Sequence, residues 1–281
     1  MTSFDTITFE VAEHVATITL NRPEALNAIN TQMQLELKTA WDEVHFNDDI
    51  HAVLLTAAGD RAFCVGADRS DMGEVSTRRR TRVDDPSKAH LRGGVVPGAP
   101  GAESTLEMNV CPKSMGAWKP VITAVNGIAC GGAFYMLGES DIIIAAEHAT
   151  FFDPHVTFGM VAGYESVHML QRMPLGEVLR MQLMGSRERL SAGRAHQIGL
   201  VSEVVPADRL HEAAWHVAST IAGYAPGAVQ GTLRAIWAAR ELPKSVALQL
   251  SPQFIGMASL DDWAAGQRTF ESGKRAEWRL R

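Results

Sequence analysis

Two glycine-containing turns, each placed after a short apolar run, are the segments best suited to chemistry. Val121–Val125 predicts a buried strand that Asn126-Gly127 ends, and Gly131-Gly132 then opens a second apolar run, Ala133–Leu137. Glycines at a helix N-terminus leave backbone N–H groups accessible, and the helix dipole adds positive charge there. The spacing matches neither a P-loop nor a dinucleotide-binding fingerprint, so it favours a site for an oxyanion.

A second turn of small residues lies earlier in the chain. The apolar run Ala52–Ala57 predicts a strand, and the segment Arg61–Asp68 that follows it also ends in small residues. Two strand ends that each present a backbone N–H can converge on one oxygen atom. The sequence therefore predicts a pair of backbone donors for one negatively charged oxygen.

Together with Asn21–Ala28, these two segments resemble the crotonase (enoyl-CoA hydratase/isomerase) superfamily. The resemblance covers roughly residues 4 to 240 in order, which makes it far more specific than any single piece. Its later segments are Asp141–Ala146, Ala149–Phe152, Leu190–Ala192, Ile198–Val201 and Val204–Pro206.

The resemblance implies an acyl-CoA-processing enzyme of the enoyl-CoA hydratase/isomerase type, which stabilises a thioester enolate. Its oxyanion hole would be formed by the backbone N–H groups of Ala67 and Gly132. Coenzyme A would enter as part of the substrate, with no prosthetic group and no metal. The substrate-binding positions carried over from the family are Ala25, Ala28, Ala67, Asp68, Gly131 and Gly132.

The acid/base groups depart from the family pattern. Typical hydratases of the family carry two glutamates, and the matching positions here are Tyr135 and His155. Hydration of a double bond needs two groups that share one water, one taking a proton and one delivering it. A tyrosine with an ordinary pKa near ~10 is a poor base at neutral pH. The usual glutamate mechanism therefore does not carry over intact.

Other titratable groups stand close to these positions in sequence. Asp153 and His155 would point to the same side of an extended segment, where the carboxylate would orient the imidazole. Glu165 is either a carboxylate that reaches the acyl chain or an acidic residue in the first turn of a helix. Glu139 is expected on the surface or at a subunit contact, and Cys130 is expected to pack as a small residue.

Alternating strands and helices predict an α/β protein with parallel strands and crossover helices. Thr31–Phe46 has helical periodicity, with Thr31 as the expected N-cap. Its buried face would be Met33, Leu37, Trp41 and Val44. Further strands are expected at Val15–Leu20, Ile142–Ala146 and Val201–Val205. The resemblance adds a spiral of ββα repeats, which periodicity alone does not distinguish from a doubly wound sheet.

The chain after Pro206 predicts helices at Asp208–Tyr224, Gly227–Glu241 and Leu260–Trp278. We expect a spiral core over residues 1–206 and a C-terminal helical region over residues 207–281. Trp263, Phe270 and Trp278 need a surface to pack on. The resemblance implies that this surface belongs to a neighbouring subunit in a homotrimer or hexamer, and packing on the chain's own core is the alternative.

The composition of the chain argues against several other classes of protein. The chain has 281 residues and a net charge of −6, which argues against a nucleic-acid binder. No apolar run reaches the length of a membrane span, and no secretory signal is visible at the start. Three scattered cysteines indicate reduced thiols in a cytoplasmic setting, without a zinc site or a disulfide framework.

The segment Ser76–Ser104 is rich in glycine, proline and arginine and predicts a loop. The run Arg78–Arg82 within it either contacts the phosphates of coenzyme A or is simply solvated. Three functions remain open at this point. They are proton transfer or hydration on an enoyl-CoA, hydrolysis of a thioester or C–C bond with Asp153 and His155, and acyl-CoA binding without catalysis.

Overall fold

The computed structural model describes residues 4–71, 109–273 and 278–280, and its strands form two sheets. The six-stranded sheet runs in the order β1, β2, β3, β5, β7, β10, with bounds Ile7–Ala12, Val15–Leu20, Ala52–Ala57, Val121–Val125, Ile142–Ala146 and Glu203–Val205. The four-stranded sheet runs in the order β4, β6, β8, β9, with bounds Ala62–Cys64, Ile128–Cys130, Thr150–Phe152 and Leu190–Ser191.

Successive strand pairs divide between the two sheets. β3, β5 and β7 join the larger sheet, and β4, β6 and β8, which follow them along the chain, join the smaller one. α4 (Ala133–Glu139) follows the β5–β6 pair, and α5 (Gly163–Leu170) follows the β7–β8 pair. β2, β3, β5, β7 and β10 pair in parallel, while β1 is antiparallel to β2. This is the spiral of ββα units that the resemblance implied.

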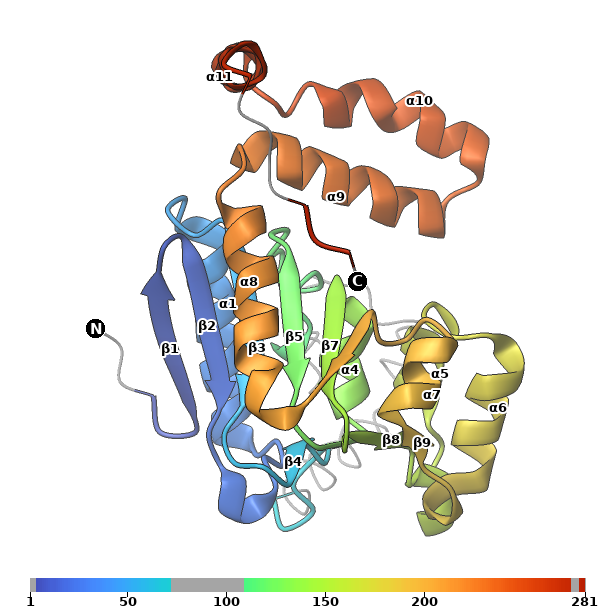
Figure 1. The fold of residues 1–281 in the computed structure, drawn as a ribbon. Helices are drawn as coiled ribbons and strands as arrows, with labels where there is room; N and C mark the ends of the chain where they lie inside the picture. Colours follow the sequence, from blue (N-terminus) through green and yellow to red (C-terminus); the bar gives the residue numbers. More distant parts are fainter. Residues whose placement is uncertain (1–3, 72–108, 274–277, 281) are drawn as a thin grey trace, which may run out of the picture.

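Two apolar layers hold the larger sheet. One face packs with α4 and with α1 (Thr31–Phe46), whose predicted face of Met33, Leu37, Trp41 and Val44 is completely buried. The other face packs under α8 (Leu210–Ala222), through its alanines and Leu210. Figure 1 shows α8 lying across the sheet and α1 behind it. The predicted apolar face of Thr31–Phe46 is therefore confirmed.

The N-cap of α1 differs from the expectation by one residue. Asn30 has extended backbone, and its side-chain oxygen accepts a hydrogen bond of 2.9 Å from the backbone N–H of Met33. Thr31 is instead the first helical residue. The correction has a simple cause, because asparagine and threonine are both good caps and the periodicity does not separate adjacent positions.

Replacing the cap should cost more than replacing its neighbour. We expect Asn30→Ala to lower the free energy of unfolding by about 1 kcal/mol, because one helix N–H loses its acceptor. Thr31→Ala should change it by less than about 0.5 kcal/mol, as for most exposed positions. Urea denaturation of both variants measures the difference, and an equal loss from both would contradict the assignment of the cap.

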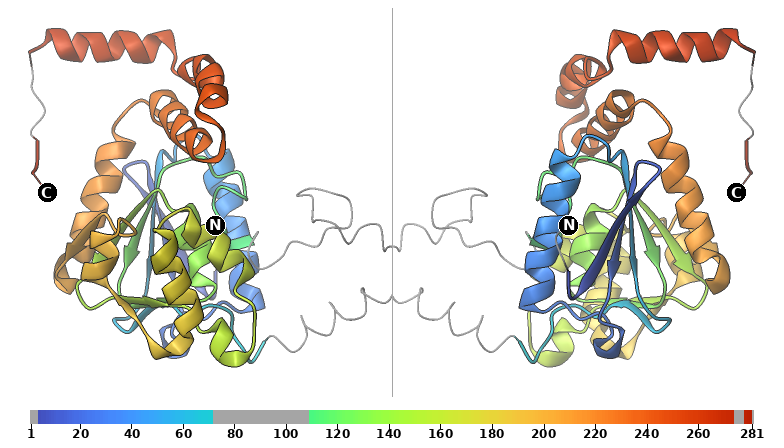
Figure 2. Two further views of the ribbon diagram at one scale, coloured as in Figure 1. Left: turned by 90° about the vertical axis from the view of Figure 1, so that its right-hand side faces the viewer. Right: turned by 90° about the vertical axis from the view of Figure 1, so that its left-hand side faces the viewer.

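The C-terminal region contains three helices beyond α8. They are α9 (Pro226–Glu241), α10 (Lys244–Ile255) and α11 (Leu260–Glu271). α10 was not anticipated, and α11 stops at Glu271 although a helix to Trp278 was expected. Figure 2 shows α11 extending away from the body of the molecule. The expected division between residues 206 and 207 falls after β10 and stays a prediction.

The described chain also contains two further helices and four 3-10 turns. α6 (Leu175–Met184) and α7 (Ala192–Gln197) follow α5, and 3-10 turns lie at Pro23–Ala25, His155–Phe158, Gly185–Arg187 and Ala207–Arg209. The expected strand Val201–Val205 is shorter, because the N–H groups of Leu200 and Val201 both donate to the carbonyl of Ala195 at the end of α7.

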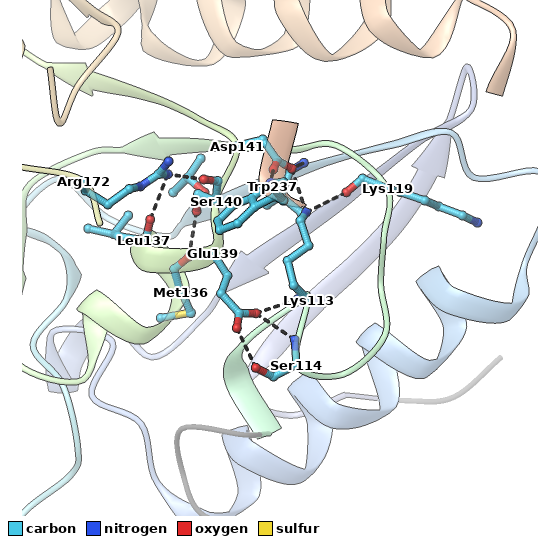
Figure 3. Close-up of polar contacts among 12 residues, drawn as sticks. Lys113, Ser114, Lys119, Met136, Leu137, Glu139, Ser140, Asp141, Arg172 and Trp237 are labelled. Carbon is cyan, nitrogen blue, oxygen red and sulfur yellow. Dashed lines mark hydrogen bonds and ion pairs between the residues drawn. The ribbon is translucent and has the colours of Figure 1, made fainter. Parts of the chain in front are cut away.

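A buried polar network joins the end of α4 to the start of β7 (Figure 3). Glu139 is only 8% exposed and accepts hydrogen bonds from the backbone N–H groups of Lys113 and Ser114 and from the Ser114 hydroxyl. The expectation of a surface position for Glu139 was therefore wrong. Its carboxylate accepts hydrogen bonds from the buried turn at Lys113 and Ser114. These partners lie 25 or more residues away in the sequence, so local sequence patterns do not reveal them.

Lys113 and Asp141 form the centre of this network. The ammonium group lies 2.7 Å from Asp141 Oδ2, and both side chains are less than a tenth exposed.

The arginine-rich segment of the sequence, including Arg78–Arg82, lies outside the described residues. Across the part of the chain that the structure covers, no helix is both long and apolar enough to cross a bilayer.

Candidate active site

The two predicted backbone donors lie next to each other where the smaller sheet ends. Ala67 follows β4 and pairs with Ile29 through hydrogen bonds that use the Gly66 carbonyl and the Asp68 N–H. Gly132 is the N-cap of α4 and is separated from the end of β6 by Gly131. A β-carbon built on Gly132 would lie 3.5 Å from the backbone nitrogen of Ala67. Among the described residues, neither of these N–H groups has a hydrogen-bond acceptor.

Gly66 is the residue that permits this approach. Its φ of +85° lies in the left-handed region, and a β-carbon there would come 2.8 Å from the nitrogen of Gly132 and 3.1 Å from the carbonyl oxygen of Cys130. Gly131 also has a left-handed φ, of +55°. Ala67 and Gly132 were predicted as site residues, but Gly66 was not. The sequence did contain a signal for Gly66, because a glycine in a strand-to-turn segment often needs positive φ.

His155 and Asp153 are in contact, although not through the expected extended segment. Pro154 has helical backbone and caps the 3-10 turn His155–Phe158, so the chain bends at this point. The bend lets Asp153 Oδ1 accept from both the backbone N–H of His155, at 2.9 Å, and the ring Nδ1, at 2.8 Å. A turn closed by the aspartate, rather than strand alternation, therefore orients the imidazole.

Glu165 faces the opposite side of the same imidazole. Its Oε1 lies 3.5 Å from His155 Nε2, and the residue is 2% exposed in the first turn of α5. Oε1 of Glu165 and Oδ2 of Asp153 are both buried without a hydrogen-bond partner. The hydrogen bond that His155 donates to Asp153 is the main cause that raises the pKa of His155, and the charges of Asp153 and Glu165 add to it while burial opposes it.

The imidazole reaches the glycine turn. A β-carbon on Gly131 would lie 3.7 Å from His155 Cε1 and 3.8 Å from Pro154 Cδ. The ring of Tyr135 borders the same turn, since its Cε2 would be 3.4 Å from a β-carbon on Gly132. The structure thus brings together the predicted backbone donors and all four predicted catalytic side chains, Tyr135, Asp153, His155 and Glu165.

The family of this chain follows from a comparison with protein-family models. The model described as enoyl-CoA hydratase/isomerase matches residues 15–251. The chain belongs to the enoyl-CoA hydratase/isomerase family. The resemblance to the crotonase superfamily is therefore confirmed, together with its α/β fold and an acyl-CoA-processing enzyme of this type.

Individual relatives agree with the family assignment. The chain is 33% identical to (E)-benzylidenesuccinyl-CoA hydratase from Thauera aromatica, over 84% of each chain. It is 34% identical to short-chain-enoyl-CoA hydratase from Clostridium acetobutylicum, over 79% of this chain and 77% of the relative. A crystal structure of an enoyl-CoA hydratase/isomerase from Mycobacterium paratuberculosis has a TM-score of 0.81 and 40% identity, and covers 99% of this chain and 100% of that chain.

The N-terminal segment predicted to bind substrate in this hydratase/isomerase chain is held against the first backbone donor. Arg22 Nη1 donates to the carbonyl of Ala28 at 2.6 Å and lies 3.0 Å from Asp68 Oδ2. Hydrogen bonds from Ser70 and then the charge of Arg22 keep the pKa of Asp68 low. Ala25 ends the 3-10 turn of this segment. Arg22 therefore connects Ala28 to Asp68, beside Ala67, and the roles of these residues toward a substrate stay predictions.

The cysteine nearest the glycine turn is not an activated nucleophile. Burial raises the pKa of the Cys130 thiol to about 12, and the nearby charge of Asp153 acts in the same direction. A thiol with so high a pKa carries almost no thiolate at neutral pH. This agrees with the expectation that Cys130 packs as a small residue.

The side chains around His155 also offer ligand atoms to a metal. Asp153, His155 and Glu165 each place one such atom within 4.8 Å of the others. However, the two carboxylates face different ring nitrogens of His155, since Asp153 contacts Nδ1 and Glu165 faces Nε2. An imidazole placed between two carboxylates in this way suits the holding and transfer of a proton better than the binding of one ion.

Proposed function

We propose that this enzyme adds water across the α,β double bond of an enoyl-CoA thioester, with His155 and Glu165 as its acid/base pair. The supporting observation is the 3.5 Å separation between His155 Nε2 and Glu165 Oε1, beside the two backbone donors. At that separation both groups can contact one water molecule. The two relatives named as hydratases support the same reaction class.

In the proposed mechanism each group has one task. The Glu165 carboxylate removes a proton from water, whose oxygen attacks the β-carbon of the substrate. Negative charge moves to the thioester oxygen, where the N–H groups of Ala67 and Gly132 stabilise it. His155 Nε2–H then protonates the α-carbon, and transfer from Glu165 to His155 restores the starting state. By the family resemblance, Tyr135 and His155 occupy the positions where typical hydratases carry glutamate. The proposed acid/base pair is therefore a histidine and a glutamate in place of two glutamates.

Asp153 positions the imidazole without touching the substrate. Because its carboxylate accepts from Nδ1, it fixes the tautomer that carries a proton there and stabilises the imidazolium. A raised pKa of His155 keeps the acid form present to higher pH than an ordinary histidine, whose pKa is near ~6.5.

The pH dependence of activity should reveal this arrangement. Since the acid form of His155 is the active one, kcat/KM should fall on the alkaline side as His155 loses its proton. Asp153→Asn removes the group that raises this pKa, so the alkaline limb should move to lower pH. A profile of kcat/KM against pH for both proteins measures the shift. An alkaline limb that stays in place in the variant would contradict the assignment of His155 as the acid.

The reaction itself is tested with crotonyl-CoA and with saturated acyl-CoAs. Loss of the ultraviolet absorbance of the conjugated thioester, without release of free thiol, is the expected result for a hydratase. An enzyme that only isomerises would need one base and would move the double bond without adding water. Tight binding of acyl-CoA with no turnover would indicate a protein that binds without catalysis.

A hydrolase is the second candidate, and the Asp153–His155 contact of 2.8 Å favours it. A histidine oriented by an aspartate can activate water for attack on a carbonyl carbon. This function would release free thiol from a thioester, or cleave a C–C bond in a diketone. Either product in the same assay would replace the hydratase proposal.

We also propose that the enzyme forms a homotrimer, or a hexamer of paired trimers, through its C-terminal helices. Leu260, Trp263 and Phe270 of α11 are 85%, 67% and 82% exposed in the single chain, and Trp278 is 79% exposed. Large aromatic side chains gathered in this way usually mark an interface. The buried cysteines Cys64, Cys111 and Cys130 form no disulfide among the described residues, which supports a reducing, cytoplasmic compartment.

Polar substitutions on α11 should therefore weaken the assembly. Trp263→Ser together with Phe270→Ser should shift the molar mass, measured by light scattering, from three or six chains toward one, because the burial of two aromatic side chains is lost. Phe46→Ser is the control, since Phe46 is 77% exposed on α1. A mass that the α11 variant leaves unchanged would contradict this role for α11.

A further inference from the structure

Helices α4 and α5 approach each other closely at one glycine, Gly138. A β-carbon built on Gly138 would lie 2.4 Å from Nδ1 of His168 and 2.5 Å from both Cβ and Cγ of His168. Carbon atoms in ordinary contact are about 3.5–4.0 Å apart. Because the β-carbon of His168 is fixed to the backbone of α5, no rotation of the histidine side chain would relieve this contact. Gly138 therefore lets the two helices lie closer together than a larger residue would allow.

The imidazole of His168 also contacts a buried thiol through its other nitrogen. Its Nε2 lies 3.9 Å from Sγ of Cys111, and that thiol donates a hydrogen bond of 3.3 Å to the carbonyl oxygen of Tyr135 on α4. Cys111 and Gly138 are both buried. His168 thus joins α5 to α4 and to the segment before β5 with a single side chain.

The ring of Tyr135 packs against the same turn of α5. Its centroid lies 6.2 Å from the ring centroid of Tyr164, at an interplanar angle of 89°, and 6.1 Å from that of His168. Edge-to-face contacts between rings at such separations are favourable. Tyr164 and His168 are four residues apart and so lie on one face of α5. Glu165 belongs to the helical turn that these two contacts hold.

α5 is the less firmly held of the two helices. All seven residues of α4, Ala133–Glu139, are buried, whereas Glu165 and Met169 are the buried residues of α5. A side chain that pushed the helices apart would therefore move α5 and leave Gly132, the N-cap of α4, in place. Restoring an ordinary contact at Gly138 requires a movement of about 1 Å. A displacement of about 1 Å in an active site can lower the rate about 10²-fold.

We propose that the packing of His168 against Gly138, together with the ring of Tyr135, positions Glu165 to remove a proton from water. This inference rests on the proposed function, in which Glu165 is the base. Gly138 and His168 are positioning residues, because they affect the reaction through the placement of Glu165. Tyr135, at the position where typical hydratases carry a glutamate, holds the helix that supplies a different carboxylate.

Gly138→Ala is the direct test. Gly138 lies within α4 without a left-handed φ, and alanine is the better helix former there, so a loss of activity would come from the contact with His168. We expect kcat for crotonyl-CoA to fall about 10²-fold. The affinity for a saturated acyl-CoA should change little, because Ala67 and Gly132 stay in place. Gly176→Ala is the matched control and should leave kcat unchanged, since a β-carbon at that position in α6 would meet nothing within 4 Å.

Two further backgrounds distinguish positioning from a general loss of structure. In Glu165→Gln the displaced group is already inactive, so Gly138→Ala should lower kcat no further. In His168→Gly the β-carbon that Gly138→Ala would strike is absent, so adding Gly138→Ala should cost little. Steady-state kinetics of the single and double variants, with a binding titration of each, measure these effects.

His168→Gly carries the test if Gly138→Ala fails to fold, because it removes the same contact from the other helix. It should lower kcat without changing the affinity for acyl-CoA, and only when Glu165 is present. The proposal is overturned if either variant folds and keeps a normal kcat, if the loss is as large in Glu165→Gln as in the unchanged enzyme, or if acyl-CoA affinity falls in parallel with kcat. A normal kcat for Glu165→Gln alone would instead refute the proposed function, and this inference with it.

Discussion

Replacing His155 by glutamine should lower kcat for crotonyl-CoA by about 10²–10⁴-fold, the usual contribution of a general acid or base. Glutamine can still accept or donate hydrogen bonds beside Asp153, but it cannot give up a proton to the α-carbon. The affinity for a saturated acyl-CoA should change little, because the backbone donors at Ala67 and Gly132 are untouched. Steady-state kinetics and a binding titration on the same protein measure the two effects separately.

A matched control is available on a neighbouring turn. His148 is exposed and contacts the carbonyl oxygens of Asp60 and Asn126 through Nε2, away from the imidazole of His155. His148→Gln should retain nearly full activity. If both variants kept normal kinetics, His155 would not take part in the reaction, and the hydrolase and hydratase proposals would fail together.

Glu165→Gln should reproduce the loss seen with His155→Gln, since each member of the pair is needed for one proton transfer. Residues that act as one unit give effects that do not add. The double variant should therefore be little worse than either single one. Additive losses in kcat would show that the two residues act in separate steps, which the 3.5 Å contact does not suggest.

Gly66→Ala should lower kcat by about 10²–10³-fold, because it disturbs the oxyanion hole without removing any catalytic side chain. A β-carbon at Gly66 would lie 2.8 Å from the Gly132 nitrogen, so the two strand ends must move apart. The alanine is also strained by the φ of +85° at this position. The result is a pair of N–H groups that no longer point at one oxygen.

Gly199→Ala distinguishes the effect of the steric contact at Gly66 from the effect of its left-handed backbone. Gly199 has the same φ of +85°, but a β-carbon there would meet nothing within 4 Å. Both alanine variants should lose similar stability from the left-handed backbone, and only Gly66→Ala should lose most of its activity. Thermal unfolding and kinetics of the two variants give the comparison. Equal activity would mean that the spacing of the two strand ends does not control the reaction.

The sequence contained most of the information for the core and for the backbone part of the site. Apolar runs predicted β2, β3, β5 and β7 with their correct bounds, and the buried face of α1. These elements are determined by the periodic burial of their own side chains, a local signal. The two turns suggested a pair of backbone donors, but the identity of the donors, Ala67 and Gly132, came from the family resemblance, because no local pattern reports how two strand ends meet.

The end of the chain shows where local signals were present but misread. α11 ends at Glu271, and Gly273 has a left-handed φ of +68°, a common position for glycine just beyond a helix. The aromatic Trp278 suggested a longer helix than this glycine allows. α10 was not predicted, and it contains Pro252, although proline in a helix interior usually indicates an end.

The side-chain part of the site depends on contacts that span several turns. Asp153 and His155 were predicted to meet, but along a strand, whereas a turn at Pro154 brings them together. Glu165 faces His155 only because the chain reverses between them, at Gly159 with its φ of +70°. Such a reversal joins residues ten positions apart, and neither strand nor helix periodicity predicts it.

The central claim is that two main-chain N–H groups hold the thioester oxygen while His155 and Glu165 move protons beside it. A crystal structure of the enzyme with acetoacetyl-CoA bound tests it most directly. We predict that the thioester oxygen lies about 2.7–3.1 Å from the nitrogens of both Ala67 and Gly132, with the β-carbon facing His155 and Glu165. A thioester oxygen bound elsewhere, or in contact with only one of these nitrogens, would contradict the account.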